Sequence, residues 1–65
     1  MNTVYALFYK DDLAGVYTSY RRAVQALMTR MALPLTGFLS EFDIEFYTDA
    51  NNNTWMIREV ELDEI

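Results

Sequence analysis

The 65-residue chain contains no cysteine and no histidine. Without cysteine it forms neither disulfides nor thiolate–zinc sites, and without histidine it lacks the commonest metal ligand and general base. Its two serines, Ser19 and Ser40, follow no motif that would place a base beside them. We therefore expect no cofactor, no metal site and no enzymatic activity.

Long apolar runs and basic segments are also missing. No stretch approaches the roughly 18 apolar residues of a membrane-spanning helix, and residues 1–4 lack the positively charged start of a secretory signal peptide. These absences predict a cytoplasmic protein without a membrane partner. Five Lys and Arg residues stand against ten Asp and Glu residues, and the resulting net charge of −5 disfavours direct binding of nucleic acid.

The small size of the chain limits the core that it can build. At 65 residues, a single domain is near the size at which one hydrophobic core is only just sufficient. Because disulfides and metals are excluded, oligomerisation is the remaining aid to stability. The hydrophobic fraction of 52% is high for so short a chain. We therefore expect a homodimer or a higher homo-oligomer that buries apolar surface between its subunits.

The hydrophobic pattern predicts four strands and one helix in a single domain spanning residues 1–65. The strands are expected at about residues 3–9, 15–17, 41–48 and 55–62, and the helix at about residues 19–31, with Thr18 or Ser19 as its N-cap. This order, β-β-α-β-β, is typical of an α+β fold. We expect a four-stranded antiparallel sheet with one amphipathic helix packed on one face.

The apolar residues of these elements indicate which faces are covered. In the predicted helix they form one stripe: Tyr20, Ala23, Val24, Leu27, Met28 and Met31. The first strand is apolar on both faces, so one of its faces stays open when the helix covers the other. We expect Tyr5, Tyr9 and Tyr47 on the open face, and Phe38 and Leu39 as apolar plugs at the open end of the core.

Acidic residues alternate along two of the predicted strands. Glu41, Asp43 and Glu45 follow one another at steps of two, as do Glu59, Glu61 and Asp63. Such steps measure about 6.8 Å, close to the spacing of phosphates along DNA. One interpretation is a solvated face that protects the sheet edge. The other is a partner-binding surface made of Asp43, Glu45, Glu59, Glu61, Tyr5, Tyr9 and Tyr47.

Two further patterns have a functional and a plain interpretation. Arg21 and Arg22 at the predicted helix start, with Tyr17 beside them, suit the phosphate and base of a small nucleotide, but they also fit the ordinary solvent side of a helix. Asp49-x-Asn51-x-Asn53 matches the first half of a calcium loop, whose second half is missing. A polar hairpin turn accounts better for this second pattern.

Several segments together resemble a class of small uncharacterised bacteriophage and prophage proteins of β-β-α-β-β type. The shared frame comprises V-Y-A-L-F-Y at residues 4–9, G-V-Y-T-S at 15–19, Ala23, and I-R-E-V-E-L-D-E at 57–64. The resemblance implies a phage-type accessory protein in the host cytoplasm that inhibits a host protein, such as a defence or nucleic-acid-binding factor, by occlusion. The alternatives are an oligomeric sponge that sequesters a small nucleotide signal and a structural module of a phage assembly.

Overall fold

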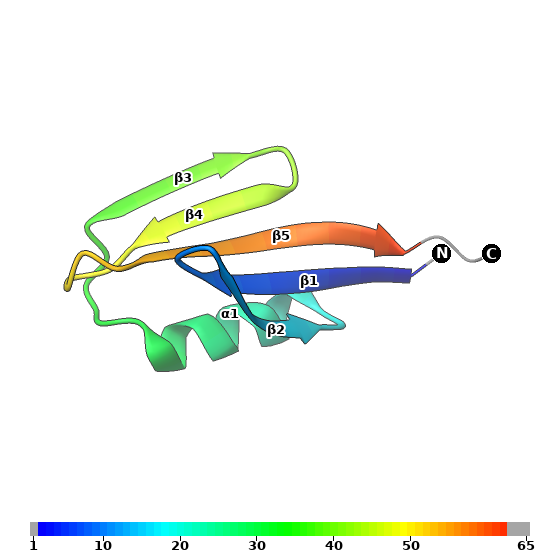
Figure 1. The fold of residues 1–65 in the computed structure, drawn as a ribbon, viewed down its shortest axis with the longest axis horizontal. Helices are drawn as coiled ribbons and strands as arrows, with labels where there is room; N and C mark the ends of the chain where they lie inside the picture. Colours follow the sequence, from blue (N-terminus) through cyan, green and yellow to red (C-terminus); the bar gives the residue numbers. More distant parts are fainter. Residues whose placement is uncertain (1, 63–65) are drawn as a thin grey trace.

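Five strands and one helix follow one another along the part of the chain that the computed structural model describes, residues 2–62, with side chains from residue 3 onward. The elements are β1 (Asn2–Tyr9), β2 (Asp12–Tyr17), α1 (Tyr20–Arg30), β3 (Gly37–Glu41), β4 (Ile44–Thr48) and β5 (Thr54–Leu62). The strands form one antiparallel sheet in the order β2-β1-β5-β4-β3. In Figure 1, α1 runs along the β1–β2 side of the sheet, whereas β3 and β4 lie beyond β5.

The predicted α+β class is confirmed, and the predicted count of four strands is wrong. Residues 41–48, expected as one strand, instead contain a two-residue turn at Phe42 and Asp43 that joins β3 to β4. The apolar and polar residues keep alternating through this turn, so the period-two pattern gives no sign of it. Phe38 and Leu39, expected as plugs of the core, lie in β3 and are 58% and 53% exposed.

The β1–β2 hairpin contains a β-bulge. Leu7 pairs with Gly15 and Phe8 pairs with Leu13, so Ala14 is the extra residue on β2. The bulge breaks the alternation that would mark a regular strand, which is why β2 begins three residues before the predicted position. It also rotates the two ends of β2 relative to each other, and this decides which of its side chains face α1.

The helix is confirmed to within one residue at each end. Ser19 is its N-cap, and the Ser19 hydroxyl accepts a hydrogen bond from the backbone N–H of Arg22 at 3.2 Å. The helix ends at Arg30, ahead of Pro34, which disfavours helical backbone in the residue before it. Within the described residues, no helix is both long enough and apolar enough to cross a membrane.

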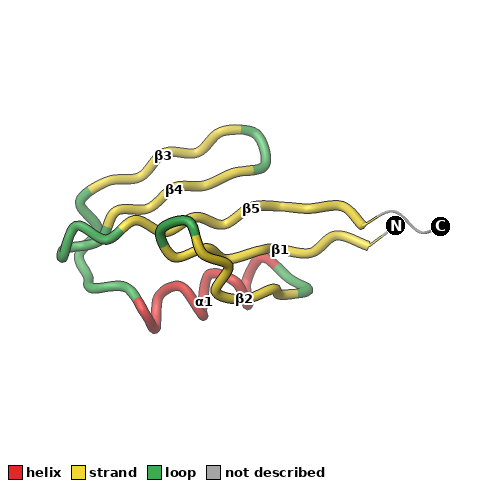
Figure 2. The backbone as a smooth tube through the Cα atoms, in the orientation of Figure 1, coloured by secondary structure: helices red, strands yellow, loops and turns green. Residues whose placement is uncertain are grey.

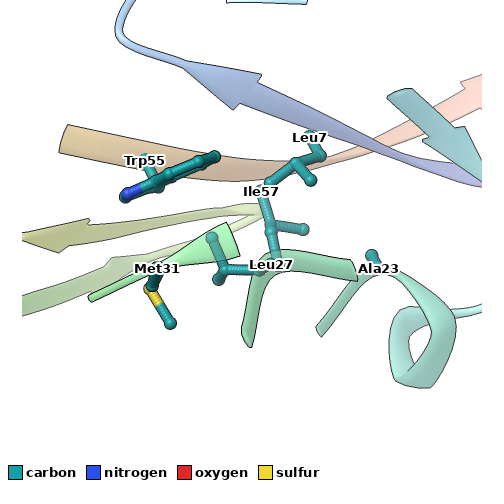
Figure 3. Packing of buried hydrophobic residues seen from close by; sticks show 6 residues of the cluster. All are labelled: Leu7, Ala23, Leu27, Met31, Trp55 and Ile57. Carbon is teal, nitrogen blue, oxygen red and sulfur yellow. The ribbon is translucent and has the colours of Figure 1, made fainter. Parts of the chain in front are cut away.

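The core lies between α1 and the central strands. It consists of the six side chains labelled in Figure 3: Leu7, Ala23, Leu27, Met31, Trp55 and Ile57. The helix contacts β1, β2 and β5, so the β3–β4 hairpin has no helix over it. Of the predicted helical stripe, Tyr20 and Met28 lie at its margins and remain 44% and 50% exposed.

The predicted location of the tyrosines is wrong. Tyr5 and Tyr9 share the face of β1 with Leu7, and together with Tyr47 they pack against the helix-covered core. The other face of β1, which carries Val4, Ala6 and Phe8, is the open one. The strand is apolar on both sides, so its sequence alone does not determine which side α1 covers.

The loops after α1 and β4 lie together at the same end of the sheet (Figure 2). A backbone hydrogen bond of 2.7 Å from Ala50 to Ala32 joins them. This contact fixes the point at which the chain leaves the helix and enters β3, and thereby the position of the β3–β4 hairpin relative to α1.

Candidate partner-binding cleft

A small cleft opens on the helix side of the sheet, where the start of α1, the β3–β4 turn and β5 meet. Its lining combines carboxylates with aromatic and aliphatic side chains: Tyr5, Tyr20, Phe42, Asp43, Glu45, Ile57 and Glu59. The volume of the cleft is about 60 Å³, well below the roughly 300–1,000 Å³ of typical small-molecule pockets. It has room for one functional group of a partner.

Glu45 is the organising residue of the cleft. Its Oε1 atom accepts a hydrogen bond from the Tyr20 hydroxyl at 2.6 Å and another from the Tyr47 hydroxyl at 2.7 Å. One phenol comes from α1 and the other from β4, so a single carboxylate oxygen ties the helix to the hairpin. Both phenols donate to the same oxygen, which leaves Oε2 to accept from another donor.

The two phenols are held in their neutral form. The hydrogen bond to the Glu45 carboxylate, followed by partial burial, raises the pKa of Tyr20 above its ordinary value. Burial is the first cause of the raised pKa of Tyr47, and the hydrogen bond to Glu45 is the second. Both hydroxyls therefore remain hydrogen-bond donors at neutral pH.

The other two carboxylates of the cleft are positioned by the sheet. The backbone N–H of Glu59 donates to the carbonyl of Asp43 at 2.8 Å, which ties the β3–β4 turn to β5. In the pairing of β1 with β5, Glu59 stands directly opposite Tyr5, whose ring meets that of Tyr20 edge to face at 5.9 Å. The side chains of Asp43 and Glu59 are exposed, so their charges face solvent at the mouth of the cleft.

Phe42 is the most unusual residue of the site. Its side chain is fully exposed, at 108% of the reference area, and its backbone has a positive φ of 43°. This is the first central position of a two-residue hairpin turn, where positive φ favours glycine. A bulky side chain in this conformation is strained and gains nothing from burial. The fold does not require phenylalanine at this position, which points to a role in contact with another molecule.

The structure brings part of the predicted surface together. Asp43, Glu45, Glu59 and Tyr5 line the cleft, and Tyr47 joins it through Glu45. The predicted row of Glu41, Asp43 and Glu45 along one strand is wrong, because the β3–β4 turn interrupts it. Glu61 lies two residues beyond Glu59 on β5 without lining the cleft, and Asp63 falls outside the described residues.

Tyr9 lies apart from the cleft, at the other end of β1. Its ring packs against that of Trp55 with a centroid distance of 4.5 Å and an angle of 48° between the ring planes, and the Lys10 ammonium lies 5.4 Å from its centroid.

Sequence reasoning missed Tyr20, Phe42 and Ile57 as residues that line the cleft. In the sequence, Phe42 is an apolar residue between two acidic ones, Glu41 and Asp43. An unbroken strand with alternating apolar and polar residues explains this pattern equally well, so the sequence does not reveal the turn.

The residues of the predicted nucleotide site are not gathered in the same way. Arg21 and Arg22 are exposed at the start of α1, whereas the β1–β2 turn, which contains the basic Lys10, lies at the opposite end of β2 (Figure 1). Tyr17 packs against the core and lies over Gly15, where an added Cβ would come within 2.7 Å of the Tyr17 hydroxyl. None of the residues predicted to bind the nucleotide lines the cleft.

A second hollow of about 240 Å³ lies near the β1–β2 turn. Its lining is mixed, with one residue of each charge and several apolar side chains: Lys10, Asp11, Phe46, Thr54, Trp55 and Met56. It contains neither of the arginines of the predicted nucleotide site. Two of its residues, Phe46 and Met56, lie on the open face of the sheet.

Asp49, which has the appearance of a calcium ligand in the sequence, has a structural role. Its side chain is buried, and it accepts four hydrogen bonds of 2.9–3.2 Å from the backbone N–H groups of Asn51, Asn53 and Ala32 and from the Trp55 indole. Burial alone would raise the pKa of this carboxyl, but these donors outweigh burial and lower the pKa. Among residues 2–62, no group of three or more acidic side chains is placed to hold a metal ion.

The cleft is suited to holding a cation. Carboxylates accept hydrogen bonds from guanidinium and ammonium groups, and the lining also contains three aromatic residues, a class of side chain that attracts cations: Tyr5, Tyr20 and Phe42.

Comparison of the chain with protein-family models, curated proteins and solved structures found no match.

Proposed function

We propose that this protein is a small binding protein that holds a basic segment of a partner protein in its acidic cleft. The observation that carries the proposal is Phe42, a fully exposed aromatic residue with strained backbone at the mouth of a cleft lined by three carboxylates. Aromatic residues, phenylalanine among them, are enriched in protein interfaces, and arginine is a frequent partner group there.

The proposed ligand group is an arginine or lysine side chain. The cleft volume of about 60 Å³ suits one side-chain head group. An arginine could donate to Oε2 of Glu45 and to the Asp43 and Glu59 carboxylates while its guanidinium plane lies against an aromatic ring. The rest of the partner would then cover Phe42 at the β3–β4 turn.

The mechanism that we propose is occlusion. In this mechanism the chain acts in proportion to its amount, by covering a basic surface that the partner uses to bind another molecule. The resemblance to small phage proteins favours a host protein as the partner and the host cytoplasm as the compartment. A basic surface that normally binds nucleic acid would fit both the cleft and the acidic character of the chain, whose net charge is −5.

The nucleotide-sponge alternative has one supporting observation, the exposure of Arg21 and Arg22 at the N-terminus of α1. Neither arginine lines either of the two hollows described above, so the binding site of a sponge would have to be completed by a second copy. No particular observation favours a structural module of a phage assembly.

A short cationic peptide tests the cleft without knowledge of the partner. We expect hexa-arginine, titrated into ¹⁵N-labelled protein, to shift the backbone amide signals of Tyr5, Tyr20 and Glu59 before those of Asp11 and Asp12 at the far end of the sheet. Binding should weaken steeply between low and physiological salt, because exposed charges carry it.

A matched pair of variants separates the cleft from overall charge. Asp43→Asn with Glu59→Gln removes two exposed carboxylates of the cleft, and Asp11→Asn with Asp12→Asn removes two exposed carboxylates elsewhere. We expect the first pair to weaken peptide binding by about tenfold and the second to change it by less than threefold. Equal effects of the two pairs would show that attraction is set by net charge, and the proposal would be rejected.

Native mass spectrometry of the untagged protein from cells that carry the presumed target addresses the alternatives. A complex with one host polypeptide supports the binder. Homo-oligomers that carry extra mass of a few hundred daltons support the sponge and identify its ligand.

A further inference from the structure

The face of the sheet opposite α1 carries an apolar row across its full width. Strand pairing places one residue from each strand in this row: Leu39 of β3, Phe46 of β4, Met56 of β5, Phe8 of β1 and Leu13 of β2. Leu13, Leu39 and Phe46 are 59%, 53% and 40% exposed. A contiguous apolar surface of this kind is rare on the exterior of a monomer.

The row on one side extends the apolar surface. It carries Val16, Ala6 and Ile44 with Arg58 between them, and Val4 pairs with Val60 further along β1 and β5. The row on the other side is polar and carries Thr54, Thr48 and Gly37. The bulge in β2 contributes to this arrangement, because it puts Leu13 and Val16 on the same face although they are three residues apart.

Few charged residues lie on this face. Glu41 lies on it at the edge of the sheet, with the basic Arg58 in the same row, and the oppositely charged pair Lys10 and Asp11 borders it at the hollow beside Phe46 and Met56. Asp43, Glu45 and Glu59 belong to the cleft on the other side. A chain of net charge −5 can therefore bring this face against an identical one without bringing its acidic residues together.

We propose that this face binds a second copy of the chain, so that two sheets pack face to face with their apolar rows in contact. A membrane surface is a poorer occupant, because anionic lipids would repel a chain of net charge −5 whose basic residues at this face are Arg58 and, beside Asp11, Lys10. Two stacked sheets with an apolar layer between them are a common arrangement of antiparallel sheets.

The size of the face matches a small dimer. Five strands spaced about 4.8 Å apart, each about five residues long, with the additional length of β1 and β5, cover about 500 Å² per copy. Two copies then bury about 1,000 Å², which is the lower limit for a specific interface. This area predicts a dimer that dissociates at low concentration.

A two-fold axis along the apolar row keeps the Arg58 side chains of the two copies apart. It brings each residue of the row opposite its own counterpart in the other copy. Arg58 lies two residues, about 6.8 Å, to one side of the row, so the two arginines end on opposite sides of the axis, about 14 Å apart. Both clefts then face outward, and a dimer could hold two basic segments at once, with a corresponding gain in avidity.

The test is the mass of the protein in solution, measured by sedimentation equilibrium from 1 to 200 μM. The monomer mass is 7.6 kDa, so we expect a shift from about 8 to about 15 kDa with rising concentration. Leu13→Lys with Leu39→Lys should raise the dimer dissociation constant by tenfold or more, on the order of the cost of burying an unpaired charge. Met28→Lys with Leu33→Lys changes two equally exposed apolar residues away from this face and should leave dissociation unchanged.

A second measurement covers the case in which the row variant fails to fold. In a mixture of ¹³C-labelled and unlabelled wild-type protein, isotope-filtered NOE spectra should show contacts between copies from Met56, Phe46 and Leu39. A wild-type monomer at 200 μM, or a dimer whose intermolecular contacts come from other residues, would overturn the proposal. Neither result depends on the cleft, so the proposed function is tested separately.

Discussion

The helix-covered half of the sheet and the β3–β4 hairpin use similar apolar residues in opposite ways. Under α1, Leu7, Ala23 and Leu27 are completely buried. In the hairpin, Phe38, Leu39, Phe42 and Phe46 are all at least 40% exposed. The first half holds the buried core of a very small domain, and the second displays apolar surface that the folded monomer covers only in part. This division suggests that stability and recognition are assigned to different parts of the chain.

The largest expected effect of a single substitution is in the helix-covered half. Leu27 is fully buried in the cluster that α1 forms with β1 and β5. Leu27→Ala removes buried methyl groups and leaves a cavity, so we expect a loss of about 2–5 kcal/mol in the free energy of unfolding. A 65-residue domain has little stability to spare, and much of the protein should be unfolded at 37 °C. Urea unfolding followed by circular dichroism measures this loss.

Met28→Ala is the control for this substitution. Met28 is the next residue of the same helix and is 50% exposed, so we expect a change of less than about 1 kcal/mol. If the two variants lost equal stability, the core would not lie where the structure places it.

The sequence predicted the helix well and parts of the sheet poorly. Helical spacing, the cap at Ser19 and the proline after the helix locate α1 to within one residue at each end, because local interactions govern these features. The β3–β4 turn was missed because Phe42 occupies a turn position at which glycine or asparagine is normally found. The start of β2 was missed because the bulge at Ala14 interrupts the alternation of inward and outward side chains that marks a regular strand.

The residue types of the candidate site could be predicted from the sequence, but the arrangement of these residues in space could not. The composition pointed to carboxylates and tyrosines, and four of the predicted residues line one cleft: Tyr5, Asp43, Glu45 and Glu59. Which face of β1 meets the helix depends on the whole packing arrangement, since both faces are apolar. The bonds from Tyr20 and Tyr47 to Glu45 join residues that are 25 positions and two positions away from it, and only the folded chain brings all three together.

An intermediate effect is expected at Asp49, which links the two halves through the loops after α1 and β4. Asp49→Ala leaves the N–H groups of Asn51, Asn53 and Ala32 without their acceptor, as well as the Trp55 indole. Unsatisfied buried donors are costly, so we expect a lower thermal midpoint than for the wild type. Asn51→Ala, at an exposed position of the same turn, should have a much smaller effect.

The same carboxylate predicts a loss of stability in acid. The folded state lowers the pKa of Asp49, so its contribution is fully present above the unfolded-state pKa of about 3.9. It is lost as the pH falls through the lower pKa of the folded state. Thermal midpoints measured from pH 6 to pH 2 should therefore fall more in the wild type than in Asp49→Ala. Parallel curves for the two proteins would contradict the role assigned to this residue.

The smallest effect on stability, and the sharpest test of the comparison, is expected at Phe42. Phe42→Gly relieves the positive φ of 43°, and the gain of about 1–2 kcal/mol from that relief is offset by the greater freedom of glycine in the unfolded chain. We expect a change of less than about 1 kcal/mol in the free energy of unfolding, toward greater stability. The same substitution removes an aromatic ring from the mouth of the cleft and should weaken hexa-arginine binding measured by isothermal titration calorimetry. A variant that gains stability and loses binding would mean that the hairpin retains phenylalanine for recognition at a cost to the fold. A variant that loses stability and binds normally would place Phe42 among the residues that support the fold, and the division between the two halves would not extend to the tip of the hairpin.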